Sequence, residues 1–196
     1  MNTKKTRRIF PLLATLFACN AATLMLPTIH QAQAKEKTTM VGGAAMYPSK
    51  NIVENAVNSK DHTTLVAAVQ AAGLADTLSG PGPFTVFAPT NEAFNKLPTD
   101  TVPTLLKPEN KDTLSSVLTY HVVPGNYSAK DLIKLIKTGK GKAELKTVQG
   151  QLLTFTRDHK KIIITDAKGG KSNITIPDVK QSNGVIHVVD TVLMPN

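Results

Sequence analysis

The chain has 196 residues, 41% of them apolar and 19% charged, which is typical of one folded domain with short appendages and excludes a wholly disordered chain. A single Cys excludes a disulfide framework and a four-cysteine zinc site. The net charge of +9 falls to +5 after residue 34, where 19 basic residues face 14 acidic ones, and this balance is too diffuse to indicate nucleic-acid binding by itself.

The first 34 residues have the three parts of a secretory signal peptide: a basic head, an apolar stretch, and the small residues Ala32-Gln33-Ala34 before a charged run. Cleavage after Ala34 removes Cys19 and leaves a thiol-free protein, which suits an oxidising compartment outside the cytoplasm. We therefore expect a secreted protein, periplasmic or at the cell surface, with no integral membrane span after cleavage. Two alternatives are acylation of Cys19, as in a lipoprotein, and an N-terminal anchor that is retained.

Residues 35–47 are charged and then rich in Gly and Ala, and they predict a flexible lead-in to a domain over residues 48–195. From Asn51 onward, apolar residues recur at helical spacing and predict a first helix. A second helix is predicted to begin at Asp61, a good N-cap residue, and to end at Gly73.

The middle of the chain predicts a buried strand among helices. Residues 84–87 are β-branched or aromatic and lead into Ala88-Pro89, which indicates a strand that ends there. Thr90 or Asn91 can cap the helix that follows. Helical spacing or capping residues predict further helices over 100–107, over 109–119 and from Ser128, with a short strand at 121–123.

The last third of the chain changes to short runs of Val, Ile, Thr and Leu separated by turn residues. Helices first and strands later predict an α+β domain, and no repeat period indicates a solenoid. Gly184 is expected to adopt a positive φ at the turn before the last strand. The runs predict five strands, over 143–148, 151–156, 161–166, 171–176 and 184–189.

No sequence motif points to catalysis. The chain after residue 34 has four His, and no two of them lie at the spacing of metal ligands on a helix. A nucleophile elbow, a phosphate-binding loop and a catalytic Cys are all lacking from the sequence. We therefore expect a protein that is not an enzyme and uses no metal and no cofactor. The four histidines are His62, His121, His159 and His187.

Lysines are concentrated where the last predicted helix leads into the first of the five strands. They are either a solvated face or a patch for anionic polysaccharide or lipid head groups. No aromatic residues lie between them, so a nucleic-acid stacking platform is not expected. The six lysines are Lys130, Lys134, Lys137, Lys140, Lys142 and Lys146.

Three stretches together resemble the fasciclin domain family. Residues 84–94, FTVFAPTNEAF, resemble its first signature stretch, and residues 183–195, NGVIHVVDTVLMP, are similar to its second. Tyr120-His121 stands where the family has a Tyr-His motif. The resemblance covers about residues 48–195. It implies a compact wedge of short β-strands flanked by several α-helices, without catalysis and without a cofactor.

The resemblance also implies a binding surface. In animal matrix members of the family, the Tyr-His motif and an Asp-Ile pair are implicated in integrin binding. Here Tyr120 and His121 match, and Asp178-Val179 takes the place of Asp-Ile with Val for Ile. The signal peptide looks bacterial, so the integrin itself is not carried over. For His121 and His187, which lie in apolar segments, the alternative is a hydrogen-bonded role in the core.

The expected function is therefore a secreted, monomeric binding or adhesion module. It would recognise a protein or polysaccharide of the cell envelope or matrix through a surface patch near Tyr120, His121, Asp178 and Val179. The alternative is an envelope protein that binds anionic polysaccharide or lipid through the lysines of residues 130–146. Neither hypothesis involves nucleic acid.

Overall fold

A computed structural model describes residues 37–196, so the predicted signal peptide, its cleavage after Ala34 and the lipidation of Cys19 lie outside the described residues. The helices are α1 (Ile52–Ala56), η1 (Lys60–His62), α2 (Thr63–Ala72), α3 (Ala75–Ser79), α4 (Asn91–Asn95), α5 (Thr101–Leu105), η2 (Pro108–Asn110), α6 (Lys111–Tyr120) and α7 (Ala129–Thr138). The strands are β1 (Thr39–Val41), β2 (Ala44–Met46), β3 (Phe84–Pro89), β4 (Val122–Pro124), β5 (Lys142–Lys146), β6 (Leu152–Asp158), β7 (Lys161–Thr165), β8 (Lys171–Gln181) and β9 (Gly184–Val189).

Local capping chemistry starts several of these helices. The side chain of Thr90 accepts a hydrogen bond from the backbone of Ala93 and begins α4 as predicted. Ser128 and Asp131 form a reciprocal capping box at the start of α7, also as predicted. Asp61, in contrast, lies inside the short helix η1 and does not cap α2, which begins at Thr63.

The lead-in differs from the flexible segment that its composition predicts. Residues 39–46 form an antiparallel hairpin, β1–β2, whose turn residues Gly42 and Gly43 both have positive φ. Val41 and Met46 are buried in the core, and this burial offsets the conformational entropy that ordering the segment costs.

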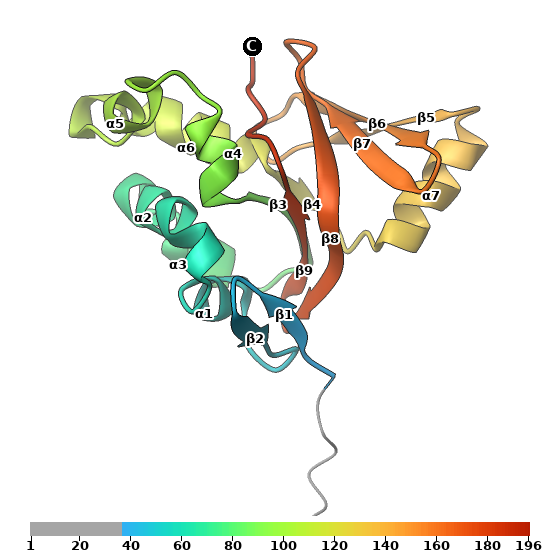
Figure 1. Cartoon of the computed structure of the whole chain (residues 1–196), viewed down its shortest axis with the longest axis horizontal. Coiled ribbons are helices and arrows are strands. Elements are labelled where there is room, and N and C mark those ends of the chain that lie inside the picture. Colours follow the sequence, from blue (N-terminus) through green and yellow to red (C-terminus); the bar gives the residue numbers. More distant parts are fainter. Residues whose placement is uncertain (1–36) are drawn as a thin grey trace, which may run out of the picture. The chain divides into compact units, whose positions relative to one another are not determined.

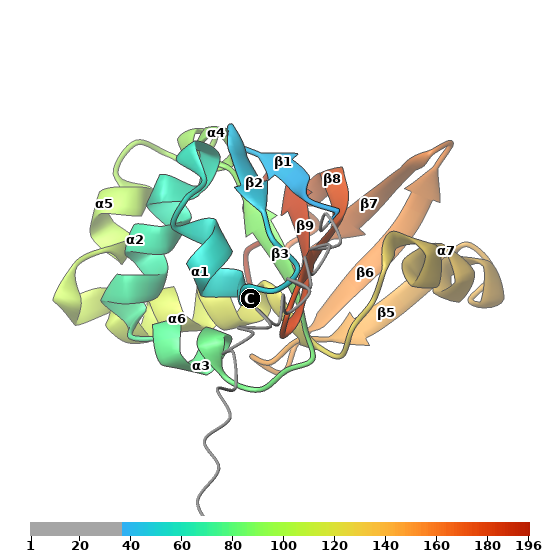
Figure 2. The same cartoon turned by 90° about the horizontal axis from the view of Figure 1, so that it is seen from below.

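Seven strands form one sheet in the order β4-β3-β9-β8-β7-β6-β5 (Figure 1). The central pair β3–β9 is parallel, and every other neighbouring pair in this sheet is antiparallel. Register shifts in β8 between Ile174 and Val179 mark β-bulges, which bend the strand. Helices α1–α6 lie on one side of β3 and β9, whereas α7 lies beside β5 and β6 (Figure 2).

The apolar side chains form two core clusters, one on each face of the central strands. One joins the helices α1–α6 to β3 and β9, and includes Ile186 and Val188. The other joins α7 to β6 and β7, and includes Phe87 and Val189. Because β9 is covered on both faces, all six of its residues are buried. The α+β prediction is confirmed.

Gly184 has a different role from the positive φ that we expected. Its φ is not in the left-handed region, and it lies opposite Phe84 in the parallel β3–β9 pair. A Cβ at Gly184 would collide with the carbonyl oxygen of Phe84. Glycine is required there because the two backbones approach closely.

Candidate functional site

Tyr120, the first residue of the Tyr-His motif, ends α6 and is fully buried. Its hydroxyl donates a hydrogen bond of 3.1 Å to the carbonyl oxygen of Leu152 and accepts one of 2.9 Å from the backbone N–H of Ala167. Burial raises the pKa of the phenol, so the hydroxyl keeps its proton. Tyr120 thus ties the end of α6 to the start of β6 and to the β7–β8 turn.

His121, the second residue of the motif, is the C-cap of α6, one residue before the strand in which we expected it. The side chain is buried, and Nδ1 lies 2.8 Å from the carbonyl oxygen of Val117, to which it donates. Nε2 accepts a hydrogen bond of 3.0 Å from the backbone N–H of Leu193. Burial lowers the pKa of the ring to about 4. His121 therefore has the hydrogen-bonded core position that was the alternative to a binding role.

Asp178 and Val179 lie at the bulge of β8, and of this pair only Asp178 reaches the surface, because Val179 is buried. Asp178 has a φ of 58°, which is uncommon for a residue with a side chain. Its Oδ1 accepts a hydrogen bond of 2.7 Å from the backbone N–H of Ala129, the first residue of α7. The carboxylate thus satisfies one of the free N–H groups at that helix end.

A second buried histidine, His187, is hydrogen-bonded to the backbone of Asp178. Nδ1 of His187 accepts a hydrogen bond of 3.3 Å from the backbone N–H of Asp178, and Nε2 donates one of 2.8 Å to the carbonyl oxygen of Tyr127. Burial lowers the pKa of His187, so its ring is neutral. His187 therefore has the core role that we considered for it.

The four residues of the predicted patch fall into two separate hydrogen-bond networks. Tyr120 and His121 bond to the β6 start, the β7–β8 turn and the C-terminal segment, whereas Asp178 bonds to the start of α7 and to His187. No hydrogen bond within residues 37–196 joins the two pairs. Three of the four side chains are buried, so Asp178 alone can contact a partner directly in this structure.

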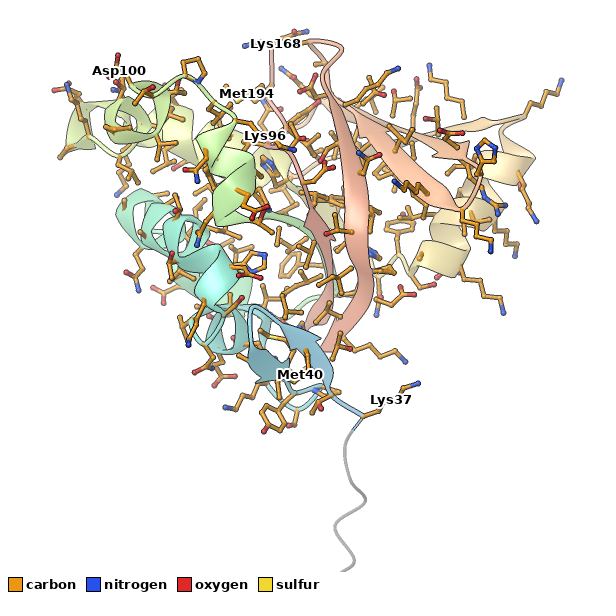
Figure 3. All side chains as sticks on the ribbon, in the orientation of Figure 1. Lys37, Met40, Lys96, Asp100, Lys168 and Met194 are labelled. Carbon is orange, nitrogen blue, oxygen red and sulfur yellow. The ribbon has the colours of Figure 1, made fainter. Side chains whose placement is uncertain are left out.

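The exposed side of Asp178 faces a hollow of about 440 Å³ between the β1–β2 hairpin and β8. Lys37, labelled in Figure 3, lies at this hollow. The sequence did not predict this hollow, because residues 35–47 were expected to be flexible. The Gly42-Gly43 pair could have indicated the β1–β2 hairpin that forms one side of it, since two glycines between two short segments are typical of a two-residue hairpin turn. The hollow is lined by Lys37, Thr39, Met46, Pro48, Asp178 and Lys180.

Asp166 is a further structural residue that the sequence did not single out. Its Oδ1 accepts hydrogen bonds from the backbone N–H groups of Lys168 and Gly170, and its Oδ2 accepts one from that of Met194. Together with His121, Asp166 fixes the C-terminal segment against the sheet.

All six lysines between residues 130 and 146 are exposed, on α7, on β5 and, for Lys140, in the turn between them. Lys142 forms an ion pair of 2.7 Å with Glu144. Within the described residues, no three His, Cys, Asp or Glu side chains gather in a way that could hold a metal ion. None of the helices in that part of the chain combines the length and apolar character needed to cross a membrane.

Comparison with known proteins agrees with the motifs. Residues 60–195 match the model of the fasciclin domain. The chain belongs to the fasciclin domain family. It is 45% identical to the protein sll1483 of Synechocystis sp., over 88% of this chain and 89% of that one. It is 33% identical to the cell surface glycolipoprotein MPB83 of Mycobacterium bovis, over 83% of this chain and 68% of the relative.

The fasciclin fold is also found in a solved structure, a FAS1 domain pair from the insect cell adhesion molecule Fasciclin I. The TM-score is 0.66 with 20% sequence identity, and the match covers 82% of this chain and 58% of the other. At this identity the likeness concerns the fold alone. Fasciclin domains serve adhesion, which supports a general role of that type for this chain.

Proposed function

We propose that this fasciclin domain is a secreted binding module that attaches, without catalysis, to a protein or other component of the cell envelope or matrix. Family membership supports the adhesive role, and a relative described as a cell surface glycolipoprotein supports the location. The observation that carries the proposal is the hollow beside Asp178, because Asp178 is partly exposed there while the other residues that the family resemblance implies are buried.

The lining of the hollow suits recognition of a protein. Pro48 contributes apolar surface, and Asp178, Lys37 and Lys180 contribute charges of both signs. A mixed apolar and polar surface of this kind is typical of non-obligate protein interfaces. In this proposal Tyr120, His121 and Val179 act indirectly: they are part of the core that supports the surface around Asp178.

The test is capture of a partner from envelope extract by the immobilised protein, washed with buffers of increasing salt. We expect a discrete protein to remain bound at about 0.5 M salt, where exposed charge pairs are largely screened. The double variant Asp178→Asn with Lys180→Gln is expected to release that protein at a lower salt concentration, because it lacks the charged hydrogen-bonding groups of the hollow. Asn at residue 178 keeps an oxygen that can accept from Ala129, so the start of α7 is preserved.

A matched control is Asp112→Asn with Lys111→Gln, which removes one charge of each sign from exposed residues of α6. This control should retain the partner. Equal retention by the hollow variant and by the native protein would contradict the assignment of the hollow.

A further inference from the structure

The sheet register brings together two basic turns that are far apart in the sequence. Lys142, at the start of β5, pairs with Thr156 of β6, and Asp158 pairs with Lys161 across the β6–β7 hairpin. The residues just before Lys142 therefore lie beside the residues just after Thr156, with neighbouring strands about 4.8 Å apart. Both turns lie on the side of the molecule away from α1–α6 (Figures 1 and 2).

We call the basic residues of these two turns and of the adjoining strand ends, together with the last lysine of α7, the cationic tip. Every one of them is exposed. The acidic residues on the same turns and strands are Glu144, which pairs with Lys142, and Asp158, whose carboxylate lies 2.7 Å from Nδ1 of His159. The tip consists of Lys137, Lys140, Lys142, Arg157, Lys160 and Lys161.

The tip holds most of the excess charge of the domain. Six cations against Glu144 and Asp158 give +4, whereas the whole chain after residue 34 has a net charge of +5. The positive charge that looks diffuse in the composition is therefore concentrated at one place in the fold. Such a concentration raises the local density of anions and attracts an anionic partner.

A row of lysines extends the tip along α7. Lys130, Lys134 and Lys137 follow one another at intervals of four and three residues, so they lie on one face of the helix. At 1.5 Å per residue this row is about 10 Å long, and the α7–β5 and β6–β7 turns continue it beyond the end of the helix. Lys142 and Lys161 lie on the face of the sheet opposite α7, because their neighbours Ala143 and Ile162 face the core cluster that α7 covers. The row and the two turns together form a cationic track that is longer than a single small anion requires.

We infer that this track binds a linear anionic polysaccharide, one that carries carboxylate or sulfate groups along its chain. The tip consists of cations without exposed large apolar side chains, whereas the core of a protein interface is apolar and poor in charge, which argues against a folded protein partner. Among the described residues, the large apolar side chains that are exposed are Met40, Tyr47, Val57, Leu135, Val148 and Leu152, and of these Leu135 alone lies in the track, on α7. A single side chain that is 36% exposed is a small anchor for the acyl layer of a membrane, which needs a broad apolar face. This surface is separate from the hollow beside Asp178.

The test uses fluorescent dextran sulfate as the probe and uncharged dextran of equal length as its control. We expect the protein to bind dextran sulfate and not dextran. The triple variant Lys140→Gln, Arg157→Gln, Lys160→Gln should lose about tenfold or more in affinity at about 0.15 M salt, and its affinity should depend less steeply on salt.

A matched triple variant separates the tip from net charge alone. Lys60→Gln, Lys107→Gln and Lys168→Gln also removes three charges from exposed residues, and Lys168, labelled in Figure 3, lies away from α7. We expect this variant to lose less than about threefold in affinity. Equal losses in the two triple variants would overturn the inference, because binding would then follow net charge and not the tip.

A second arm distinguishes polysaccharide from lipid. Vesicles of phosphatidylglycerol should displace dextran sulfate poorly. If the vesicles bind more tightly than dextran sulfate and the tip variant loses that binding, the partner is a membrane surface and the inference is wrong. Urea unfolding of both triple variants should match that of the native protein, since the substituted side chains are exposed. The tip variant should also retain the high-salt protein partner, so this test can fail without the test of the hollow failing.

Discussion

The Nε2 atom of His121 accepts a hydrogen bond of 3.0 Å from the backbone N–H of Leu193, which joins the end of α6 to the segment that follows β9. Nδ1 of the same ring is bonded to Val117. A protonated imidazole has no acceptor atom, so the bond to Leu193 exists only while His121 is neutral.

Acid should therefore destabilise the fold. The pKa of His121 is about 4 in the folded protein and 6.5 in an unfolded chain, and burial also lowers the pKa of His62 and His187. As pH falls from 6.5 to 4, the unfolded chain binds more protons than the folded one, so the free energy of unfolding decreases. His121 alone accounts for roughly 3 kcal/mol of this loss. Urea titrations at several pH values measure it.

The variant His121→Gln should make that pH dependence less steep but not abolish it, because the lowered pKa values of His62 and His187 still contribute. A free energy of unfolding that stays constant between pH 6.5 and 4.5 in the native protein would contradict this account.

The Tyr120 hydroxyl is expected to stabilise the fold through its two hydrogen bonds. Tyr120→Phe leaves the carbonyl of Leu152 and the N–H of Ala167 without this partner, and we expect a loss of about 1–2 kcal/mol in the free energy of unfolding. Tyr47→Phe is the control, because Tyr47 is 41% exposed. Equal stability of the two variants in urea would show that the buried hydroxyl contributes nothing.

Gly184 should tolerate no side chain. Gly184→Ala places a Cβ against the carbonyl of Phe84, so β3 and β9 must move apart, and we expect a loss of more than about 2 kcal/mol. Gly43→Ala is a useful comparison, since nothing lies near its Cβ and only its φ of 76° opposes the substitution, at about 1 kcal/mol. Thermal unfolding of the two variants should rank them in this order, and the reverse order would argue against close approach at Gly184.

Asp178 should respond differently to its two simplest substitutions. Asp178→Ala removes the acceptor for the Ala129 N–H and places alanine at a positive φ, so we expect a loss of about 1–3 kcal/mol. Asp178→Asn keeps the acceptor and suits that φ, so its loss should stay below about 1 kcal/mol. Urea unfolding of the two variants, compared with native protein, checks this; similar losses would mean that the bond to α7 does not matter.

Local chemistry explains what the sequence could predict. The capping box of Ser128 and Asp131 and the cap at Thr90 involve residues three apart, so the motif alone locates the helix start. The buried strand 84–87 likewise follows from its β-branched and aromatic residues. These features depend on neighbours in the sequence and not on the rest of the fold.

Features that depend on distant partners escaped prediction. Gly184 is needed because Phe84 lies opposite it, and no local pattern reveals that pairing. The cationic tip exists because β5 pairs with β6 in one particular register, which places Arg157 beside the turn that contains Lys140. Of the candidate binding residues, the sequence could not distinguish buried Tyr120 and His121 from partly exposed Asp178, because burial is a property of the assembled core.

The position of β9 has a consequence for how the protein is made. This strand is the last one of the described domain in chain order, yet it lies in the sheet between β3 and β8. A nascent chain that has not yet released residues 184–189 cannot close the sheet, because β3 has no parallel partner and β8 has no neighbour on that side. We therefore expect the domain to finish folding only after residues 184–189 have emerged, so that a chain leaving a ribosome or an export channel with its N-terminus first passes through without a finished domain.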